Sequence, residues 1–202
     1  RNRSALGKLT SLARLQAMRH LDYQRTIIAY HGCDESLVTR VLKTGETLEP
    51  SENDYDWLGT GIYFWEFGPD RAIAWAHELK KRLRVKKPSV LGAVIQLGNC
   101  FDLLDTRCTA MLQAAHRNYV CVAPKPFPAN EKFMHRLDCD VINYGLPWLT
   151  KLFGIKFQTV RGVFQEGTPV FEDSDIRETS RIQIAVRDPS CILGYFKPRW
   201  IK

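Results

Sequence analysis

Two short apolar segments, each carrying a ring beside a glycine, constrain what this chain can fold into. The first is TIIAYHG, residues 26–32, whose β-branched run ends in the imidazole of His31 and then Gly32. The second is GTGIYFW, residues 59–65, which enters through glycines and carries the phenol of Tyr63. Both patterns predict strands, and each is followed by a predicted helix. Two strand ends that carry rings indicate a ligand pocket at the strand edges.

The rest of the chain mixes predicted strands and helices without regular βαβ alternation, which favours an α+β fold. An amino-terminal helix is expected within residues 1–25 and a single domain over residues 26–202. Helices are predicted over 5–21, 35–44, 69–83, 106–120 and 131–153, the last interrupted at Gly145 and Pro147. Strands are predicted over 26–31, 62–65, 89–97, 160–164, 181–187 and 191–196, with a turn at 101–105.

Composition limits the class of protein. The chain is 45% apolar and 11% aromatic, which is typical of a folded globule. No apolar run approaches the roughly 20 residues that span a bilayer, so no membrane association is expected. The six cysteines contain no CxxC pair, which favours free thiols in a reducing cytoplasm over zinc or disulfides. Cys33 is expected to be a small buried side chain and not a nucleophile paired with His31.

The net charge of +7 favours an anionic partner: a dinucleotide, a nucleic acid or an acidic protein. The basic run at residues 80–87 has a plainer reading as a solvated helix end. The sequence has no GxGxxG, P-loop, GxSxG or HExxH motif, which disfavours the enzymes that depend on them. His116 and His135 have no partner at metal-ligand spacing and are expected at the surface or at a helix end, so no metal is expected.

Four motifs in order carry a resemblance to a known family. They are YHG at residues 30–32, GxGIYF at 59–64, AxxW at 72–75 and AVIQLGNCFDL at 93–103. Together they resemble the ADP-ribosyltransferase fold, in the branch of diphtheria toxin and poly(ADP-ribose) polymerases. That branch carries histidine, tyrosine and glutamate on three strands. The resemblance implies split antiparallel sheets with flanking helices, and residues 106–153 then look like a helical insertion.

The resemblance also implies roles in binding NAD as substrate. His31 would hold the ribose of the nicotinamide half, and the backbone of Gly32 would bond the carboxamide. Tyr63 would stack on the nicotinamide ring, and Trp75 is the candidate for closing its other side. The residue types suit this chemistry, because a glycosidic bond to a pyridinium breaks through an oxocarbenium-like state that stacked rings can shield from water.

The third element departs from the family. Gln183 lies where the family's glutamate is expected, on a strand with Ile182 and Ile184 facing the other way. Glutamine keeps a hydrogen bond and loses the charge, and relatives without the glutamate tend to be mono-transferases or inactive. A carboxylate could come instead from one of four other residues: Glu66, Glu166, Glu172 or Glu178. Arg161 and Asp140 are candidate substrate contacts, with structural ion pairing as the alternative.

These features predict an NAD-dependent mono-ADP-ribosyltransferase, with catalytic residues His31, Tyr63 and Gln183. The expected acceptor is a macromolecule, protein or nucleic acid. Compact domains of this kind look like bacterial toxins or effectors that act in the cytoplasm, for which a neutralising partner protein is a further expectation. Two alternatives stay open: an NAD glycohydrolase, and a catalytically inactive module that binds NAD or ADP-ribose.

Overall fold

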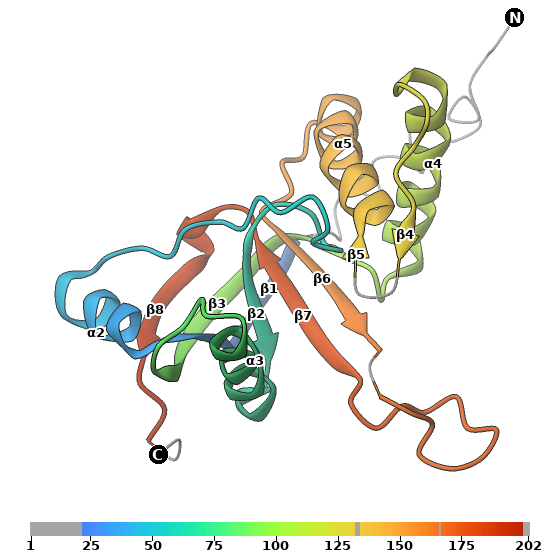
Figure 1. Cartoon of the computed structure of the whole chain (residues 1–202). Coiled ribbons are helices and arrows are strands. Elements are labelled where there is room, and N and C mark those ends of the chain that lie inside the picture. Colours follow the sequence, from blue (N-terminus) through green and yellow to red (C-terminus); the bar gives the residue numbers. More distant parts are fainter. Residues whose placement is uncertain (1–21, 132–133, 166, 200–202) are drawn as a thin grey trace, which may run out of the picture.

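A mixed sheet of six strands forms the centre of the computed structural model, which describes residues 22–131, 134–165 and 167–199 (Figure 1). The strand order is β1-β2-β7-β6-β3-β8. The strands are β1 (Asp22–Asp34), β2 (Ile62–Glu66), β3 (Pro88–Asp102), β6 (Thr159–Phe164), β7 (Arg181–Val186) and β8 (Ile192–Phe196). The α+β class predicted from the sequence is confirmed.

A further pairing between β1 and β3 closes five of these strands into a circuit of neighbours, β1-β2-β7-β6-β3 and back to β1. The β1–β3 ladder is antiparallel and extends from Asp22↔Asn99 to Asp34↔Pro88. Among the pairings of the described strands, β3–β6 alone is parallel. Because the circuit closes, strands far apart in sequence contribute side chains to the same core. Strands β2 and β7, for example, are neighbours in the sheet although 119 residues lie between the paired Phe64 and Ile184.

Local signals set both ends of α2 and the start of α3 as predicted, while α3 ends at Lys81 and not at the predicted residue 83. Helix α2 (Glu35–Thr44) begins after Asp34, whose side chain accepts a hydrogen bond from the Ser36 backbone N–H, and it ends at Gly45 with a left-handed φ of 72°. Helix α3 (Pro69–Lys81) carries Pro69 in its first turn, where the missing N–H costs nothing.

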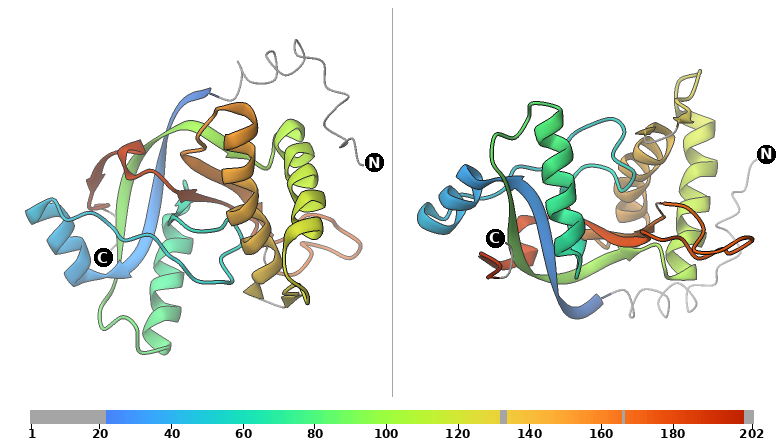
Figure 2. Two further views of the ribbon diagram at one scale, coloured as in Figure 1. Left: turned by 90° about the horizontal axis from the view of Figure 1, so that it is seen from above. Right: turned by 60° about the horizontal axis from the view of Figure 1, so that its bottom comes forward.

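Helix α3 packs closely on β1, and Gly32 makes this possible. A Cβ atom built at Gly32 would lie 2.0 Å from the carbonyl oxygen of Ala72 in α3, far inside van der Waals contact. Any side chain at this position would therefore push the helix away from the sheet. In both views of Figure 2, α3 lies beside β1.

A helical hairpin lies beside the sheet in both views of Figure 2. It consists of α4 (Thr106–Val122) and α5 (Arg136–Phe153), joined by the short strands β4 (Asn130–Glu131) and β5 (Met134–His135). The rings of Tyr119 and Tyr144 meet with centroids 5.5 Å apart across the two helices. Asp140 accepts a hydrogen bond of 3.1 Å from the Tyr119 hydroxyl, which gives this carboxylate a structural role within the hairpin.

Three details of the predicted elements are wrong. Helix α5 begins at Arg136 and not at residue 131, because Asn130–Glu131 and Met134–His135 pair as two short antiparallel strands. It also runs without interruption through Gly145 and Pro147, since its buried apolar face packs on the core and Gly145 leaves room for Ala115 of α4. Strand β3 continues to Asp102, where a turn was predicted, because its last residues pair with β6. The predicted amino-terminal helix, residues 5–21, lies outside the described residues.

Three charged side chains form a buried network between β2, β3 and β6. Nε of Arg161 lies 2.6 Å from a carboxylate oxygen of Glu66, and its Nη1 lies 2.9 Å from Asp102. All three side chains are at most 6% exposed, and Arg25 adds a longer contact to Glu66 at 3.7 Å. Arg161 is thus a structural ion-pair residue, the alternative to a substrate contact that the sequence left open.

We expect Arg161→Met to destabilise the protein by about 3–5 kcal/mol, because it leaves two buried carboxylates without their counter-charge. Urea unfolding followed by circular dichroism measures this free energy. The matched control is Arg40→Met, which breaks an exposed pair with Glu46 and should cost less than about 1 kcal/mol. Equal losses in the two variants would contradict the role of the network.

Candidate functional site

A cavity of about 530 Å³ brings together four of the residues predicted to form the site: His31, Tyr63, Trp75 and Gln183. They come from β1, β2, α3 and β7. Polar and charged residues that were not among the predicted site residues also line it: Glu49, Ser51, Asn53, Asp56, Arg71, Glu78, Arg82, Arg84 and His135. Most of these lie in loop 48–58 and in α3 and the turn that follows it.

The cavity borders the point where β1 and β2 separate. The ladder between them includes Tyr30↔Trp65, and two residues further along β2 the carbonyl of Tyr63 still points toward β1. There it accepts a hydrogen bond of 2.8 Å from Nδ1 of His31. A side chain of β1 thus takes the place of a backbone partner, and the two strands remain linked although they no longer pair.

This contact fixes the protonation pattern of the His31 ring. A carbonyl oxygen can only accept, so Nδ1 carries the hydrogen and Nε2 is left as the acceptor of a neutral ring. Burial lowers the pKa of His31, which favours that neutral form, while the bond to the Tyr63 carbonyl acts weakly in the opposite direction.

The hydroxyl of Tyr63 is held inside the protein. It accepts a hydrogen bond of 3.0 Å from the Leu58 N–H and donates one of 2.8 Å to the Gly59 carbonyl. Burial is the main reason that the pKa of this phenol is raised, so it stays protonated. The two bonds fix the plane of the ring and tie loop 48–58 to β2. Tyr63 can therefore offer a ring to a ligand in the cavity, while its hydroxyl serves the fold.

The side chain of Gln183 is oriented by an indole. Its Oε1 accepts a hydrogen bond of 2.6 Å from Nε1 of Trp57. The amide NH₂ group is therefore the end left for a ligand, and it can only donate. The strand alternates as predicted, because Ile184 and Val186 lie in one core cluster and Ala185 in another.

One wall of the cavity combines indoles and guanidinium groups. The guanidinium of Arg71 lies 5.4 Å from the ring centre of Trp65 and 5.8 Å from that of Trp75. The guanidinium of Arg82 lies 5.5 Å from the ring centre of Trp75. The indole N–H of Trp65 is buried, and no hydrogen-bond partner for it exists among the described residues. This wall can accept a planar group and an anion.

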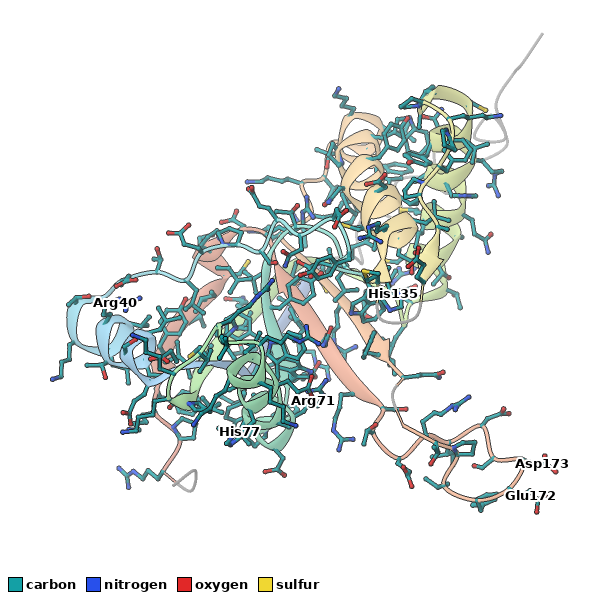
Figure 3. The ribbon with its side chains drawn as sticks, in the orientation of Figure 1. Arg40, Arg71, His77, His135, Glu172 and Asp173 are labelled. Atoms are coloured by element: carbon teal, nitrogen blue, oxygen red, sulfur yellow. The ribbon has the colours of Figure 1, made fainter. Side chains whose placement is uncertain are left out.

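None of the three described glutamates that were considered as substitutes for the family's carboxylate lines this cavity. Glu66 is engaged with Arg161, while Glu172 and Glu178 are exposed on loop 165–180. Figure 3 shows Glu172 at the outer part of that loop, away from Arg71 and His135. The fourth, Glu166, lies outside the described residues.

Asp56 is a half-buried carboxylate in the cavity wall. Its Oδ2 accepts a hydrogen bond of 2.5 Å from the Ser51 hydroxyl and a longer one of 3.4 Å from Asn53. Burial raises the pKa of Asp56. Sequence reasoning did not select this residue as part of the site. The signal was present as the polar cluster directly before the glycines at 59–61.

Two other expectations concern the neighbours of His31. Gly32 is buried and does not line the cavity. A glycine is required at this position because α3 packs too closely to leave room for a side chain. Cys33 is buried, and desolvation raises the pKa of its thiol to about 12, which agrees with a packing role.

Metal ligands and membrane spans are not evident in the part of the chain that the structure describes. Its histidine, cysteine, aspartate and glutamate side chains form no group of three that could hold a metal ion. The described helices include none with the length and apolar character needed to cross a bilayer.

Comparison with known proteins gives one distant relative. No protein-family model matches the chain. An uncharacterized protein of Methanocaldococcus jannaschii is 25% identical over 187 residues, in an alignment that covers 81% of this chain and 83% of that protein.

The lowered pKa of His31 predicts a pH effect on stability. The unfolded chain binds a proton at this ring more readily than the folded protein, so stability falls as the pH drops below about 6.5, the ordinary histidine pKa. His31→Gln removes this contribution. Urea midpoints at about pH 7.5 and 5.5 should therefore fall further in the wild type than in the variant.

The matched control for this measurement is His77→Gln, which removes an exposed imidazole of α3 (Figure 3). This variant should keep the pH dependence of the wild type. An identical dependence in the wild type and in His31→Gln would show that the ring is not kept neutral by burial.

Proposed function

We propose that the protein is an NAD-dependent mono-ADP-ribosyltransferase of the histidine–tyrosine branch, which transfers one ADP-ribose to a macromolecule and releases nicotinamide. One observation carries the proposal: the same cavity is lined by His31, Tyr63, Trp75 and Gln183. The first and last of these are 152 positions apart in the sequence. Action in the cytoplasm as a toxin or effector, with a neutralising partner, belongs to the same proposal.

The gap between β1 and β2 suits the nicotinamide riboside half of NAD. The neutral Nε2 of His31 can accept a hydrogen bond from a ribose hydroxyl. The carbonyl of Ile28 accepts a hydrogen bond from the backbone N–H of Phe67, the residue that follows β2. The backbone groups of successive residues in a strand point to alternate sides, so the N–H and C=O of Gly32 point to the same side as those of Ile28, toward β2. Gly32 does not line the cavity but directly follows His31, which does, and its N–H and C=O are the backbone groups proposed for the carboxamide.

Rings and cations support the rest of the dinucleotide. The Tyr63 ring is fixed through its hydroxyl and can stack on the nicotinamide without losing further side-chain entropy. Arg71, Arg82 and Arg84 line the cavity, and guanidinium groups bind phosphate oxygens well. The buried N–H of Trp65 is an additional donor for a ligand.

The charge that the family takes from glutamate would come from Asp56. Gln183 presents a donor, because its oxygen is held by Trp57, and a donor does not stabilise a developing oxocarbenium ion. Asp56 lines the same cavity, and Ser51 occupies only one of its oxygens by a short bond. A half-buried carboxylate acts through a lower dielectric than an exposed one.

We expect the purified protein to release nicotinamide from NAD and to show a raised melting temperature in its presence. Tyr63→Ala should reduce the release at least about 100-fold because the stacking ring is lost. Since the Tyr63 hydroxyl also supports loop 48–58, Trp75→Ala serves as a second variant that leaves those bonds in place. Chromatography of free nicotinamide measures the rate.

His77→Gln, on the same helix as Trp75 but exposed, is the control and should retain full activity. Circular dichroism establishes that each variant is folded. Unchanged release in both folded variants would refute the proposed site.

A separate variant tests the role of Asp56. Asp56→Asn can still accept the Ser51 bond but lacks the charge, so nicotinamide release should fall about 100-fold while the NAD-dependent rise in melting temperature persists. Glu49→Gln removes a more exposed carboxylate of the same cavity and is the control. Equal effects of the two substitutions would contradict a specific role for Asp56.

The bond between Trp57 and Gln183 also favours a second candidate, a binding module without chemistry. Such a module would gain stability from NAD or ADP-ribose but release no nicotinamide. The other rival, a glycohydrolase, would release free ADP-ribose steadily from NAD alone. Labelled NAD added to a whole lysate separates these cases and shows whether label enters protein, RNA, DNA or none.

A further inference from the structure

A second, open cavity of about 850 Å³ adjoins the first. The two cavities share five lining residues: Trp57, Arg71, Glu78, His135 and Phe164. They are therefore parts of one groove, with these residues at the boundary. The second cavity continues past β6 toward loop 165–180 and past the start of α5, on the far side of the proposed NAD site.

His135 is the titratable ring at this boundary. It is the last residue of β5 and lies directly before α5, and its backbone N–H donates to the Tyr55 carbonyl at 3.2 Å. Its ring stands edge-on to Phe164, with centroids 5.7 Å apart. The side chain is 30% exposed, so a ligand can reach it. Figure 3 shows it at the foot of the helical hairpin, with Arg71 on α3 across from it.

A carboxylate lies beside this imidazole. Nδ1 of His135 lies 3.5 Å from Oδ2 of Asp138, one helical turn along α5. A carboxylate in this position can accept a hydrogen bond from Nδ1–H, and Nε2 is then the nitrogen that can take a proton. The distance is long, as is common for catalytic contacts before a substrate is bound.

We propose that the second cavity binds the acceptor, and that His135 is the general base that accepts the proton of an acceptor hydroxyl. The inference rests on the proposed function. The C1′–N bond of NAD breaks with its electron pair moving to nicotinamide, an oxygen lone pair of the hydroxyl forms the new C1′–O bond, and the hydroxyl proton moves to Nε2 of His135. The imidazolium then releases this proton to water.

The chemistry of the groove selects a hydroxyl acceptor. Gln183, which replaces the family's acid, cannot take a proton, and His31 is assigned to the ribose. A carboxylate or phosphate acceptor is already ionised and would need no base. A neutral hydroxyl does need one, and His135 with Asp138 supplies it at the mouth of the first cavity.

The test uses two nucleophiles that differ in their need for a base. The full protein is incubated with NAD and either methanol or sodium azide, and the products are separated by chromatography. His135→Gln should form methyl ADP-riboside about 100-fold more slowly than the wild type but ADP-ribosyl azide at the wild-type rate, because azide carries no proton. His116→Gln, an exposed histidine on α4, is the control and should match the wild type in both arms.

Asp138→Asn should show a smaller loss with methanol alone, since it disturbs only the orientation of the ring. The rise in melting temperature with NAD should be unchanged in both variants. Repeating the alcohol arm with N-acetylserinamide and with adenosine distinguishes a protein hydroxyl from a ribose hydroxyl, and either supports the proposal.

Three results would overturn the assignment. Unchanged methyl ADP-riboside formation in His135→Gln removes the base, and a parallel loss with methanol and azide indicates a structural role. If the wild type releases no nicotinamide with either nucleophile, the proposed function fails and this inference fails with it. If it releases nicotinamide and the methanol arm does not respond to His135→Gln, the proposed function stands and this inference does not.

Discussion

The hydrogen bond between Nδ1 of His31 and the carbonyl of Tyr63 joins β1 to β2 at the point where their backbone ladder has ended. Each strand alone would present an unpaired edge there. The imidazole satisfies one carbonyl at a place where the two strands no longer pair. The same bond fixes the tautomer of the ring. One contact between a side chain and the backbone thus links the two strands beside the cavity and sets which ring nitrogen carries the hydrogen.

The sheet then supplies the remaining side chains through its closed circuit of strands. Because β2 pairs with β1 on one edge and with β7 on the other, Gln183 lies opposite Trp65 and near the ring-bearing ends of the first two strands. The buried Arg161 ties β6 to β2 and β3 and holds this circuit together by charge. A displacement of β6 would affect both cavities, since Phe164 at its end lines each of them.

Local patterns were enough to predict most elements and four of the cavity residues. Asp34 and Gly45 delimit a helix in sequence as in structure, because capping depends on neighbours in the chain. The sequence could not show that Pro147 would sit inside a continuous helix, since that depends on packing against a distant core. Asp56 was missed for a similar reason: a polar loop residue becomes half-buried only after the loop folds over the sheet.

Under the proposed function, Gln183 stands where the resemblance places a glutamate, and the tasks of that one residue would be divided between others. A glutamate can both stabilise a cation and accept a proton, but an amide held by Trp57 can do neither. Two residues that line the first cavity could take over these tasks, and both lie outside the six-stranded sheet. Asp56, on the loop before β2, could stabilise the cation, and His135, directly before α5, could accept the proton. Such a division would make α5 part of the catalytic machinery, because Asp138 of α5 lies beside His135. It would also separate the two steps in space, with bond cleavage in the first cavity and proton removal at the boundary of the two cavities.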